Sequence, residues 1–181
     1  ALAGGAGISL HLKHQAEAAA LQEARRQEEQ QKQQEEELLT EQRLKKEAHT
    51  IRLRAVGDNL IHEKIYESGI WPDGSWRYDG LYTHVQELIS QADLAAVNQE
   101  CIFVADHQNV SSYPEFGAPT EIGDALTDAG FDIIESATNH AFDKGTGAIP
   151  ETIRFWEEKH PEVTLLGIHD SHEAADTVST V

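Results

Sequence analysis

The sequence predicts an α/β fold with a mostly parallel sheet, preceded by a long charged helix. Two observations lead to this prediction. From residue 51 onward, short apolar runs of strand length alternate with segments whose apolar residues recur at helical spacing, which is typical of βαβ units. Residues 11–50, in contrast, consist mainly of Gln, Glu, Lys, Arg and Ala, and most of these residues favour helix.

The first ten residues, ALAGGAGISL, are small and apolar and carry no charge. They are too few to cross a bilayer, which takes about 20 apolar residues. We expect residues 1–10 to be the end of a signal peptide or membrane anchor; the alternative is an ordinary flexible terminus. The sequence contains no Met, so we expect a part of the protein to lie upstream of Ala1.

Residues 11–50 are predicted to form a solvated helical spacer. Opposite charges recur four residues apart, as in Glu28 with Lys32 and Glu41 with Lys45. A coiled coil would need an apolar seam that repeats every 3.5 residues. Residues 25–37 contain no apolar side chain, so this seam is interrupted.

Residues 51–181 are predicted to form one domain of alternating strands and helices. Gly130 follows a helical pattern at the position that glycine commonly takes after a helix, and Pro150 lies near the first turn of another helix. Right-handed connections between such elements give a parallel sheet. The predicted strands are 51–57, 93–98, 131–136 and 163–167, and the predicted helices are 82–91, 122–129 and 150–159.

The charge excludes some partners and some kinds of site. Asp and Glu number 32 against 14 Lys and Arg, a formal net charge of −18, and the excess of acid lies almost entirely in residues 51–181. Nucleic acid needs a basic face, so it is not expected as a partner. Contact with the membrane is expected only through an N-terminal anchor. A single Cys excludes both a disulfide scaffold and a cysteine-rich zinc site.

Polar side chains follow three of the predicted strands. Asp58 follows the first strand, Asn98-Gln-Glu100 follows the second, and Asn139-His-Ala-Phe-Asp143 follows the third. Each motif alone also suits an ordinary turn or helix cap. The carboxyl ends of parallel strands share one edge of a sheet, so together these residues predict a divalent metal site at that edge. Carboxylate, amide and imidazole ligands suit manganese, iron, zinc or magnesium, with manganese, iron or zinc the expected ions, and two such ions would clamp a phosphoryl group.

Three stretches of the sequence resemble the CapA capsule-synthesis family, also called the poly-gamma-glutamate synthesis proteins, within the calcineurin-like metallophosphatase superfamily. They are AVGD at 55–58, ADLAAVNQE at 92–100 and LTDAGFDIIESATNHAFDKG at 126–145. The third is the most specific, because the family's usual form is Asn-Asn-His-x-x-Asp-x-Gly after a Gly-Phe-Asp strand; Thr138 replaces the first Asn here. The resemblance implies half of a metallophosphatase-like α/β/β/α sandwich.

The resemblance also implies roles for individual residues. Asp58, Glu100 and Asn139 correspond to metal ligands, and His140 would face the substrate as a hydrogen-bond donor or general acid. Asp143 would either orient His140 or cap the following helix. Leu60 stands where the superfamily has a ligand histidine, and nothing after residue 167 resembles the family's later histidine motifs. We therefore expect residues 51–181 to hold an incomplete site.

The function implied by the resemblance is metal-dependent hydrolysis or transfer at a phosphoester during assembly of capsule or poly-gamma-glutamate. Capsule polymer or a phosphoester would be the substrate, a capsule synthesis complex the partner, and the cell surface the location. Two alternatives stay open: a non-catalytic scaffold subunit of capsule assembly or export, and a hydrolase or transferase acting on gamma-linked glutamate. The aromatic loop 71–78 either shapes a substrate pocket or packs over the sheet, and His169 and His172 are expected in a loop.

Overall fold

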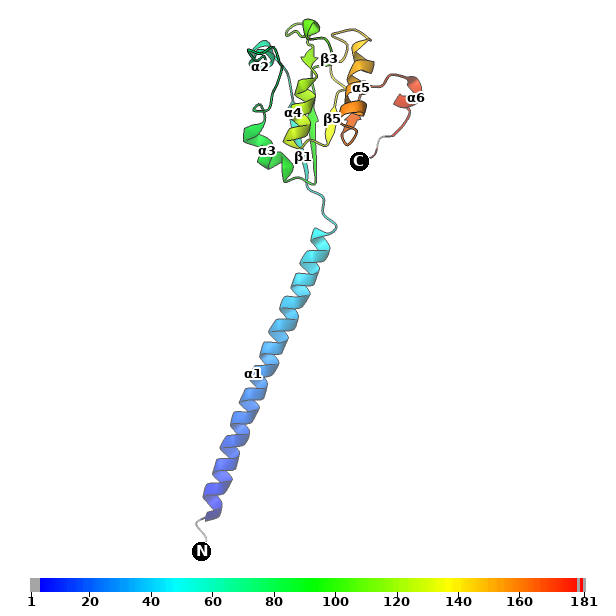
Figure 1. Ribbon diagram of the computed structural model, residues 1–181. Helices are drawn as coiled ribbons and strands as arrows, with labels where there is room; N and C mark the ends of the chain where they lie inside the picture. Colours follow the sequence, from blue (N-terminus) through cyan, green and yellow to red (C-terminus); the bar gives the residue numbers. More distant parts are fainter. Residues whose placement is uncertain (1–3, 179, 181) are drawn as a thin grey trace. The chain divides into compact units, whose positions relative to one another are not determined.

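The computed structural model describes residues 4–178 and 180 (Figure 1). The chain divides into two compact units, Ala1–Thr50 and Ile51–Val181. Residues 1–3, the start of the expected anchor segment, lie outside the described residues. Among the described helices, none is long and apolar enough to cross a membrane.

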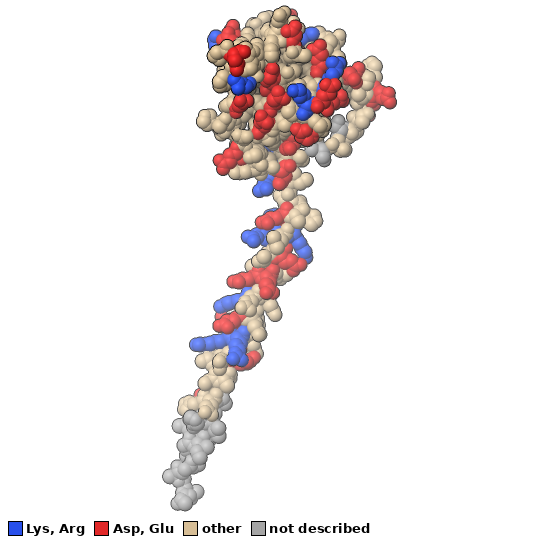
Figure 2. Space-filling view, viewed as in Figure 1, with Lys and Arg blue, Asp and Glu red and all other residues tan. Residues whose placement is uncertain are grey.

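The first unit is one continuous helix, α1 (Gly4–Glu47). All of its described side chains are exposed, including Leu38 and Leu39, which are 54% and 59% exposed. Side chains of both charge signs follow one another along its surface (Figure 2). Two predicted ion pairs are present: Glu28 lies 3.0 Å from Lys32, and Glu41 lies 2.8 Å from Lys45. The predicted long charged helix is confirmed.

The second unit contains all seven predicted elements, and each begins and ends within two residues of its predicted bounds. Several short elements carry no pattern in the sequence, because two to six residues are too few to establish a period. The elements of this unit are β1 (Leu53–Asp58), α2 (Glu63–Ser68), α3 (Thr83–Ser90), β2 (Leu94–Asn98), β3 (Phe103–Val104), the 3-10 helix η1 (His107–Asn109), β4 (Ala118–Pro119), α4 (Glu121–Ala129), β5 (Ile133–Glu135), α5 (Ala148–Lys159), β6 (Thr164–Leu166) and α6 (His172–Ala175).

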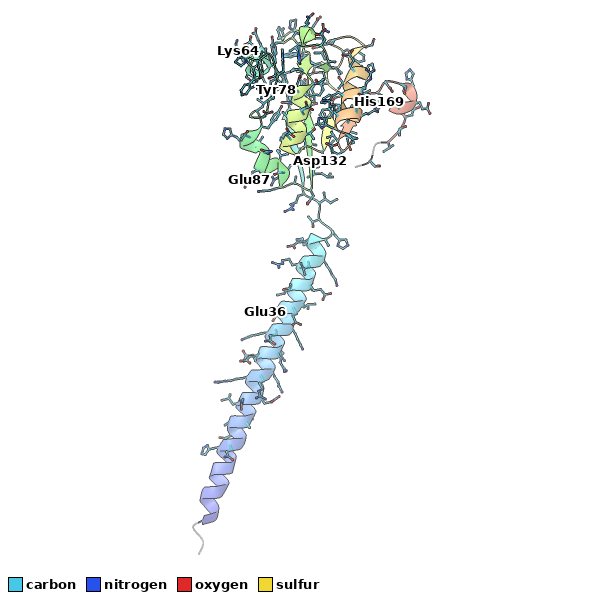
Figure 3. The ribbon with its side chains drawn as sticks, viewed as in Figure 1. Glu36, Lys64, Tyr78, Glu87, Asp132 and His169 are labelled. Atoms are coloured by element: carbon cyan, nitrogen blue, oxygen red, sulfur yellow. The ribbon has the colours of Figure 1, made fainter. Side chains whose placement is uncertain are left out.

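The main sheet has the strand order β1-β2-β5-β6, and every neighbouring pair is parallel. This confirms the predicted α/β class with a parallel sheet. Gly130 ends α4 with φ of 95°, a left-handed conformation that favours glycine. At the amino end of the sheet, Asp132 (labelled in Figure 3) accepts a hydrogen bond of 2.7 Å from the Ala95 backbone N–H, which ties the start of β5 to β2.

One face of the sheet is covered by helices (Figure 1). Val97 and Ile134 lie side by side on this face and are 3% and 0% exposed. They belong to one apolar core with residues from three helices: Ile89 of α3, Leu126 of α4 and Trp156 of α5. Burying this alternating set is what fixes the register of the strands.

The opposite face of the sheet is more open. Ala96 and Ile133 are neighbours on this face and are only half-buried, while Leu53 at the edge is 61% exposed. A single layer of helices on one face is what half of a sandwich requires. The result is a partly apolar sheet surface, and β1 and β6 are the two edge strands in the described part of the chain.

A second, two-stranded sheet of β3 and β4 lies against α5. Phe103 of β3 is 1% exposed, and its ring packs against the rings of Phe155 (5.4 Å) and Trp156 (5.7 Å). The Phe103 backbone N–H also donates to the Thr152 hydroxyl at 3.2 Å. This small sheet therefore joins the segment after β2, which bears Glu100, to α5, the helix that follows the loop bearing His140 and Asp143.

Candidate functional site

The carboxyl ends of β1 and β2 bring two predicted ligands together. Asn98 is the last residue of β2, and its side-chain Nδ2 donates to Asp58 Oδ1 at 2.7 Å and to Glu100 Oε2 at 2.6 Å. The two carboxylate oxygens can therefore be no further apart than the sum of these two distances. Asp58 and Glu100 do converge, and the side chain that links them is Asn98.

A bulge at the end of β1 places Asp58 there. Val56 pairs with Val97, but the next residue of β2, Asn98, pairs with Asp58, so Gly57 is an extra residue in the strand. The chain is held after the bulge by a 2.7 Å hydrogen bond from the Asn59 backbone N–H to the Asn98 carbonyl oxygen.

A set of amide hydrogen bonds lies behind the two carboxylates. Gln99, which is 2% exposed, accepts from Asn59 Nδ2 at 2.7 Å and donates to the Cys101 carbonyl oxygen at 2.8 Å. Asn59 Oδ1 in turn accepts from the Tyr82 hydroxyl at 2.8 Å, and burial raises the pKa of Tyr82 above its ordinary value. These contacts give the Gln99 amide a structural role, because it fixes the chain on both sides of the carboxylates.

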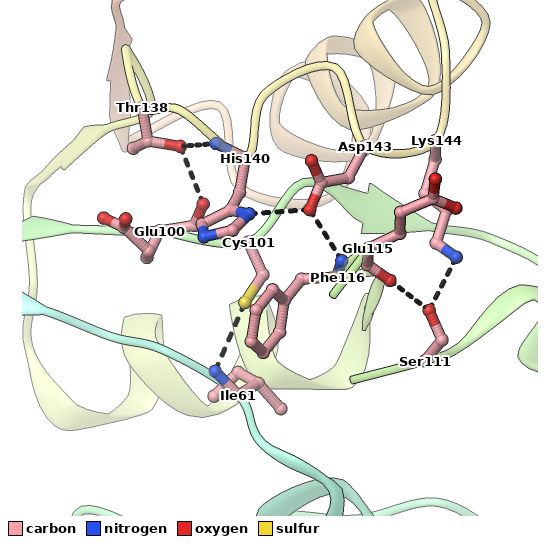
Figure 4. A network of polar contacts seen from close by, with 10 residues as sticks. All are labelled: Ile61, Glu100, Cys101, Ser111, Glu115, Phe116, Thr138, His140, Asp143 and Lys144. Atoms are coloured by element: carbon pink, nitrogen blue, oxygen red, sulfur yellow. Dashed lines mark hydrogen bonds and ion pairs between the residues drawn. The ribbon is translucent and has the colours of Figure 1, made fainter. Parts of the chain in front are cut away.

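The loop after β5 is attached to the same rim through Thr138 (Figure 4). The Thr138 hydroxyl donates to the Glu100 carbonyl oxygen at 2.8 Å and accepts from the His140 backbone N–H at 3.1 Å. The third predicted segment is thereby brought to the backbone of the second.

His140 and Asp143 form a close pair (Figure 4). His140 Nδ1 lies 2.6 Å from Asp143 Oδ2, and the two side chains are only 18% and 15% exposed. The same Asp143 oxygen accepts from the Phe116 backbone N–H at 2.7 Å. An ionised carboxylate only accepts, so His140 Nδ1 carries the hydrogen and Nε2 is the ring atom left for a ligand.

The contacts of Asp143 agree with one of the two roles predicted for it. The carboxylate orients His140 and does not cap a helix, because α5 begins only at Ala148 and Gly147 precedes it with no side-chain cap. A carboxylate that fixes the ring orientation and tautomer of a histidine is a common feature of sites in which the other nitrogen acts on a ligand.

A second histidine lies close to this pair. The Phe116 ring packs edge-on against His140, with centroids 4.7 Å apart, and against His62, with centroids 5.0 Å apart. His62 lies outside the three polar segments that predict the site in the sequence. Its position depends on the loop that bears Phe116 and on a 3.3 Å contact between His62 Nδ1 and the Ser112 hydroxyl, which sequence spacing does not reveal.

Asn139 is not brought into contact with the two carboxylates. Its side chain is exposed and makes no hydrogen bond to another described residue. Within the described residues, no three His, Cys, Asp or Glu side chains are grouped so that they could hold a metal ion. The metal-ligand roles of Asp58, Glu100 and Asn139 stay predictions.

Lys144 connects two loops beside the pair formed by His140 and Asp143. Its Nζ donates to the Ser111 hydroxyl at 2.6 Å, and that hydroxyl donates to the Glu115 carbonyl oxygen (Figure 4). The Lys144 chain runs over Gly117, where a Cβ atom would lie 2.6 Å from Lys144 Cε. Glycine at 117 is therefore what permits this contact.

Other predicted features lie apart from this site. In the aromatic loop, Tyr78 is buried, and Trp76 stacks on His107 at 4.2 Å and packs on the core, so this part of the loop packs over the domain. His169 (labelled in Figure 3) lies in the loop after β6, as expected, and His172 begins the short helix α6. Neither has a hydrogen bond or ring contact with the described site residues.

Cys101 lies directly below the site, and we predict that its thiol is inert in the folded protein. The side chain is 1% exposed, and Sγ accepts from the Ile61 backbone N–H at 3.3 Å (Figure 4). Burial raises the pKa of the Cys101 thiol from 9.0 to about 12. Since the thiolate is the reactive form, a disulfide reagent at pH 8 should modify no thiol in the native chain and one in denaturant.

The raised pKa of the Cys101 thiol also determines how the stability of the domain changes with pH. The folded-state pKa is above the unfolded one, so the contribution of the neutral thiol to the free energy of unfolding is full below pH 9.0 and is lost as the pH rises towards about 12. Fast modification of Cys101 in the native protein at pH 8 would contradict this description of the site.

The fold and the site define a class of protein: a parallel α/β domain with acidic, amide and imidazole side chains at the carboxyl ends of its strands. Within this class, the chain belongs to the family described as bacterial capsule synthesis protein PGA_cap, whose family model matches residues 52–181. This confirms the resemblance found in the sequence and makes the chain a capsule synthesis protein. A search among curated proteins gave no match.

Proposed function

We propose that the domain carries a metal-dependent phosphoesterase-type site that acts during the assembly of capsule or poly-gamma-glutamate. The observation that carries this proposal is the pairing of Asp58 and Glu100 around a single nitrogen of Asn98. Two carboxylates this close repel each other unless a hydrogen-bond donor or a cation lies between them. A divalent cation bound by oxygen ligands suits such a pair.

The residues present fit such an ion in their chemistry. Asp58 and Glu100 offer hard oxygen atoms, and Asn139 would supply an amide oxygen from the loop after β5. Manganese, iron or zinc are the ions that this set and the neighbouring imidazole favour. A divalent ion would supply positive charge to polarise a phosphoryl group, and a second ion would be expected where the site is complete.

The protein's own contribution to the reaction would come from His140. Asp143 holds the ring through Nδ1, so Nε2 is the atom that would give a proton to the leaving oxygen of a phosphoester. The acidic domain repels an anionic substrate at long range, so the ion would also serve to attract it.

The proposal is tested by Mn²⁺ binding to the chain and by phosphatase activity of the intact protein. We expect the wild-type chain to bind Mn²⁺ and the Asp58→Asn and Glu100→Gln variants to bind it at least ten-fold more weakly, because each loses a charged ligand. The intact protein should release phosphate from an aryl phosphate and should not cleave gamma-linked glutamate. Cleavage of the glutamate polymer alone would favour the peptide-bond alternative.

A scaffold role in capsule assembly or export is the second candidate. The partly exposed apolar face at Leu53, Ala96 and Ile133 favours it, since such a surface suits association with other subunits. In that case Asp58→Ala and His140→Ala strains would make normal capsule, and the protein would bind no Mn²⁺. Both proposals place the protein at the cell surface, attached by a segment at its N-terminal end. In both, a capsule synthesis complex is its partner.

A further inference from the structure

Of the two polar atoms of the Asn98 side chain, one makes hydrogen bonds and the other makes none to a described residue. Its Nδ2 makes both hydrogen bonds to Asp58 and Glu100. Its Oδ1 is buried and has no hydrogen-bond partner among the described residues. A buried acceptor left without a donor costs about 1–3 kcal/mol, so a protein keeps one only where something offsets the cost.

The two ends of the Asn98 amide suit two different states of the carboxylate pair. In the orientation described, the N–H groups lie between the two negative oxygens and reduce their repulsion. In the reversed orientation, Oδ1 would face Asp58 Oδ1 and Glu100 Oε2, and three acceptors would meet without a donor. Only a cation among them would make that second orientation favourable.

We propose that Asn98 is a metal ligand of this site through Oδ1, which its amide presents by turning over when the ion binds. The inference rests on the proposed function, because it needs an ion between the two carboxylates. Among the amide side chains considered, Asn98 contacts both carboxylates, whereas the exposed Asn139 contacts neither of them. An amide oxygen is a hard ligand and suits the same ions as the carboxylates.

The change would be confined to one side chain. The Asn98 backbone pairs with Asp58 on one side and with Glu135 on the other, and its carbonyl oxygen accepts from the Asn59 backbone N–H. This backbone is fixed within the sheet, while the terminal torsion of an Asn side chain has a broad, roughly two-fold energy profile. Turning the amide thus exchanges Nδ2 for Oδ1 without moving β2.

A purely structural role for Asn98 makes the opposite prediction. If Nδ2 only separates the carboxylates, it competes with the ion for their oxygens, and removing it would leave Mn²⁺ affinity unchanged or higher. If Oδ1 is a ligand, removing the amide lowers the affinity. The sign of the change in Mn²⁺ affinity therefore separates the two roles.

The experiment is a titration of the full chain with Mn²⁺, in which free Mn²⁺ is followed by its electron paramagnetic resonance signal. We expect Asn98→Ala to bind Mn²⁺ at least ten-fold more weakly than wild type, and Asn98→Asp, which keeps an oxygen at the same place, to bind as tightly or more tightly. Without metal, Asn98→Asp has no donor between the carboxylates, so its melting temperature should fall and should recover when Mn²⁺ is added.

Gln86→Ala is the matched control, since it removes an amide that donates to the Asp128 carbonyl oxygen at 2.8 Å, between α3 and α4, and not to a carboxylate of the site. It should lower the melting temperature without changing Mn²⁺ affinity. Asn98→Ala binding as well as or better than wild type, while Asp58→Asn binds weakly, would overturn this inference and leave the proposed function standing. A wild-type chain that binds no Mn²⁺ would overturn both.

Discussion

Replacing His140 with Ala should lower kcat for phosphoester hydrolysis by the intact protein about 10²–10⁴-fold, the range typical of a lost general acid. The expected loss follows from the geometry of the pair: Asp143 occupies Nδ1 at 2.6 Å and leaves Nε2 to the substrate. Mn²⁺ affinity should stay close to that of wild type, because the proposed ligands are other residues. Steady-state kinetics and an Mn²⁺ titration on the same preparations measure the two effects separately.

Two further variants make this prediction specific. Asp143→Asn keeps the size of the side chain but not its charge, so it should also lower kcat by disturbing the orientation of the His140 ring. His160→Ala is the matched control, because His160 forms a similar pair with Asp124 at 2.7 Å at the end of α5. It should leave kcat unchanged. A wild-type kcat in His140→Ala would contradict the catalytic role.

Replacing Phe103 with Ala should lower the free energy of unfolding of the domain by about 3–5 kcal/mol, the cost of a large cavity in a core. Phe103 is 1% exposed, and its ring contacts those of Phe155 and Trp156. Its removal would empty the space between the small sheet and α5. Urea unfolding followed by far-ultraviolet circular dichroism measures the change.

Phe142→Ala provides the comparison for this stability measurement. Phe142 is 65% exposed, so the loss of its ring should change the free energy of unfolding by no more than about 0.5 kcal/mol. Equal effects of the two substitutions, or a loss below about 1 kcal/mol in Phe103→Ala, would mean that the small sheet does not contribute to the core as described.

The sequence predicts the main sheet and its helices because each of these elements contains a recognisable pattern. The strand before Asp58 alternates, and the helices before Gly130 and after Pro150 have both an apolar face and a typical end. The strands β3 and β4 have two residues each, which is too short for any pattern. Their formation depends on tertiary contacts with α5, which local propensity does not contain.

The candidate site is predictable to the level of strands but not of side chains. Topology alone brings Asp58 and Glu100 to one edge, as expected from the parallel order. The sequence does not reveal the bulge, the loop paths or the rotamers. These determine the link through Asn98, the exposed position of Asn139 and the approach of His62 to Phe116. Those features are set by packing between segments about 40 or more residues apart in the chain.

The position of β1 at an edge of the sheet determines which of the two carboxylates leaves the site first when the sheet opens locally. In the described sheet β1 pairs only with β2, whereas β2 is held on both sides. Local opening begins where the fewest hydrogen bonds and contacts resist it, so amide hydrogens of β1 should exchange with solvent before those of β2. Asp58 would leave the site during such fluctuations while Glu100 stays in place, and an occupant bound between them would slow exchange along the whole edge.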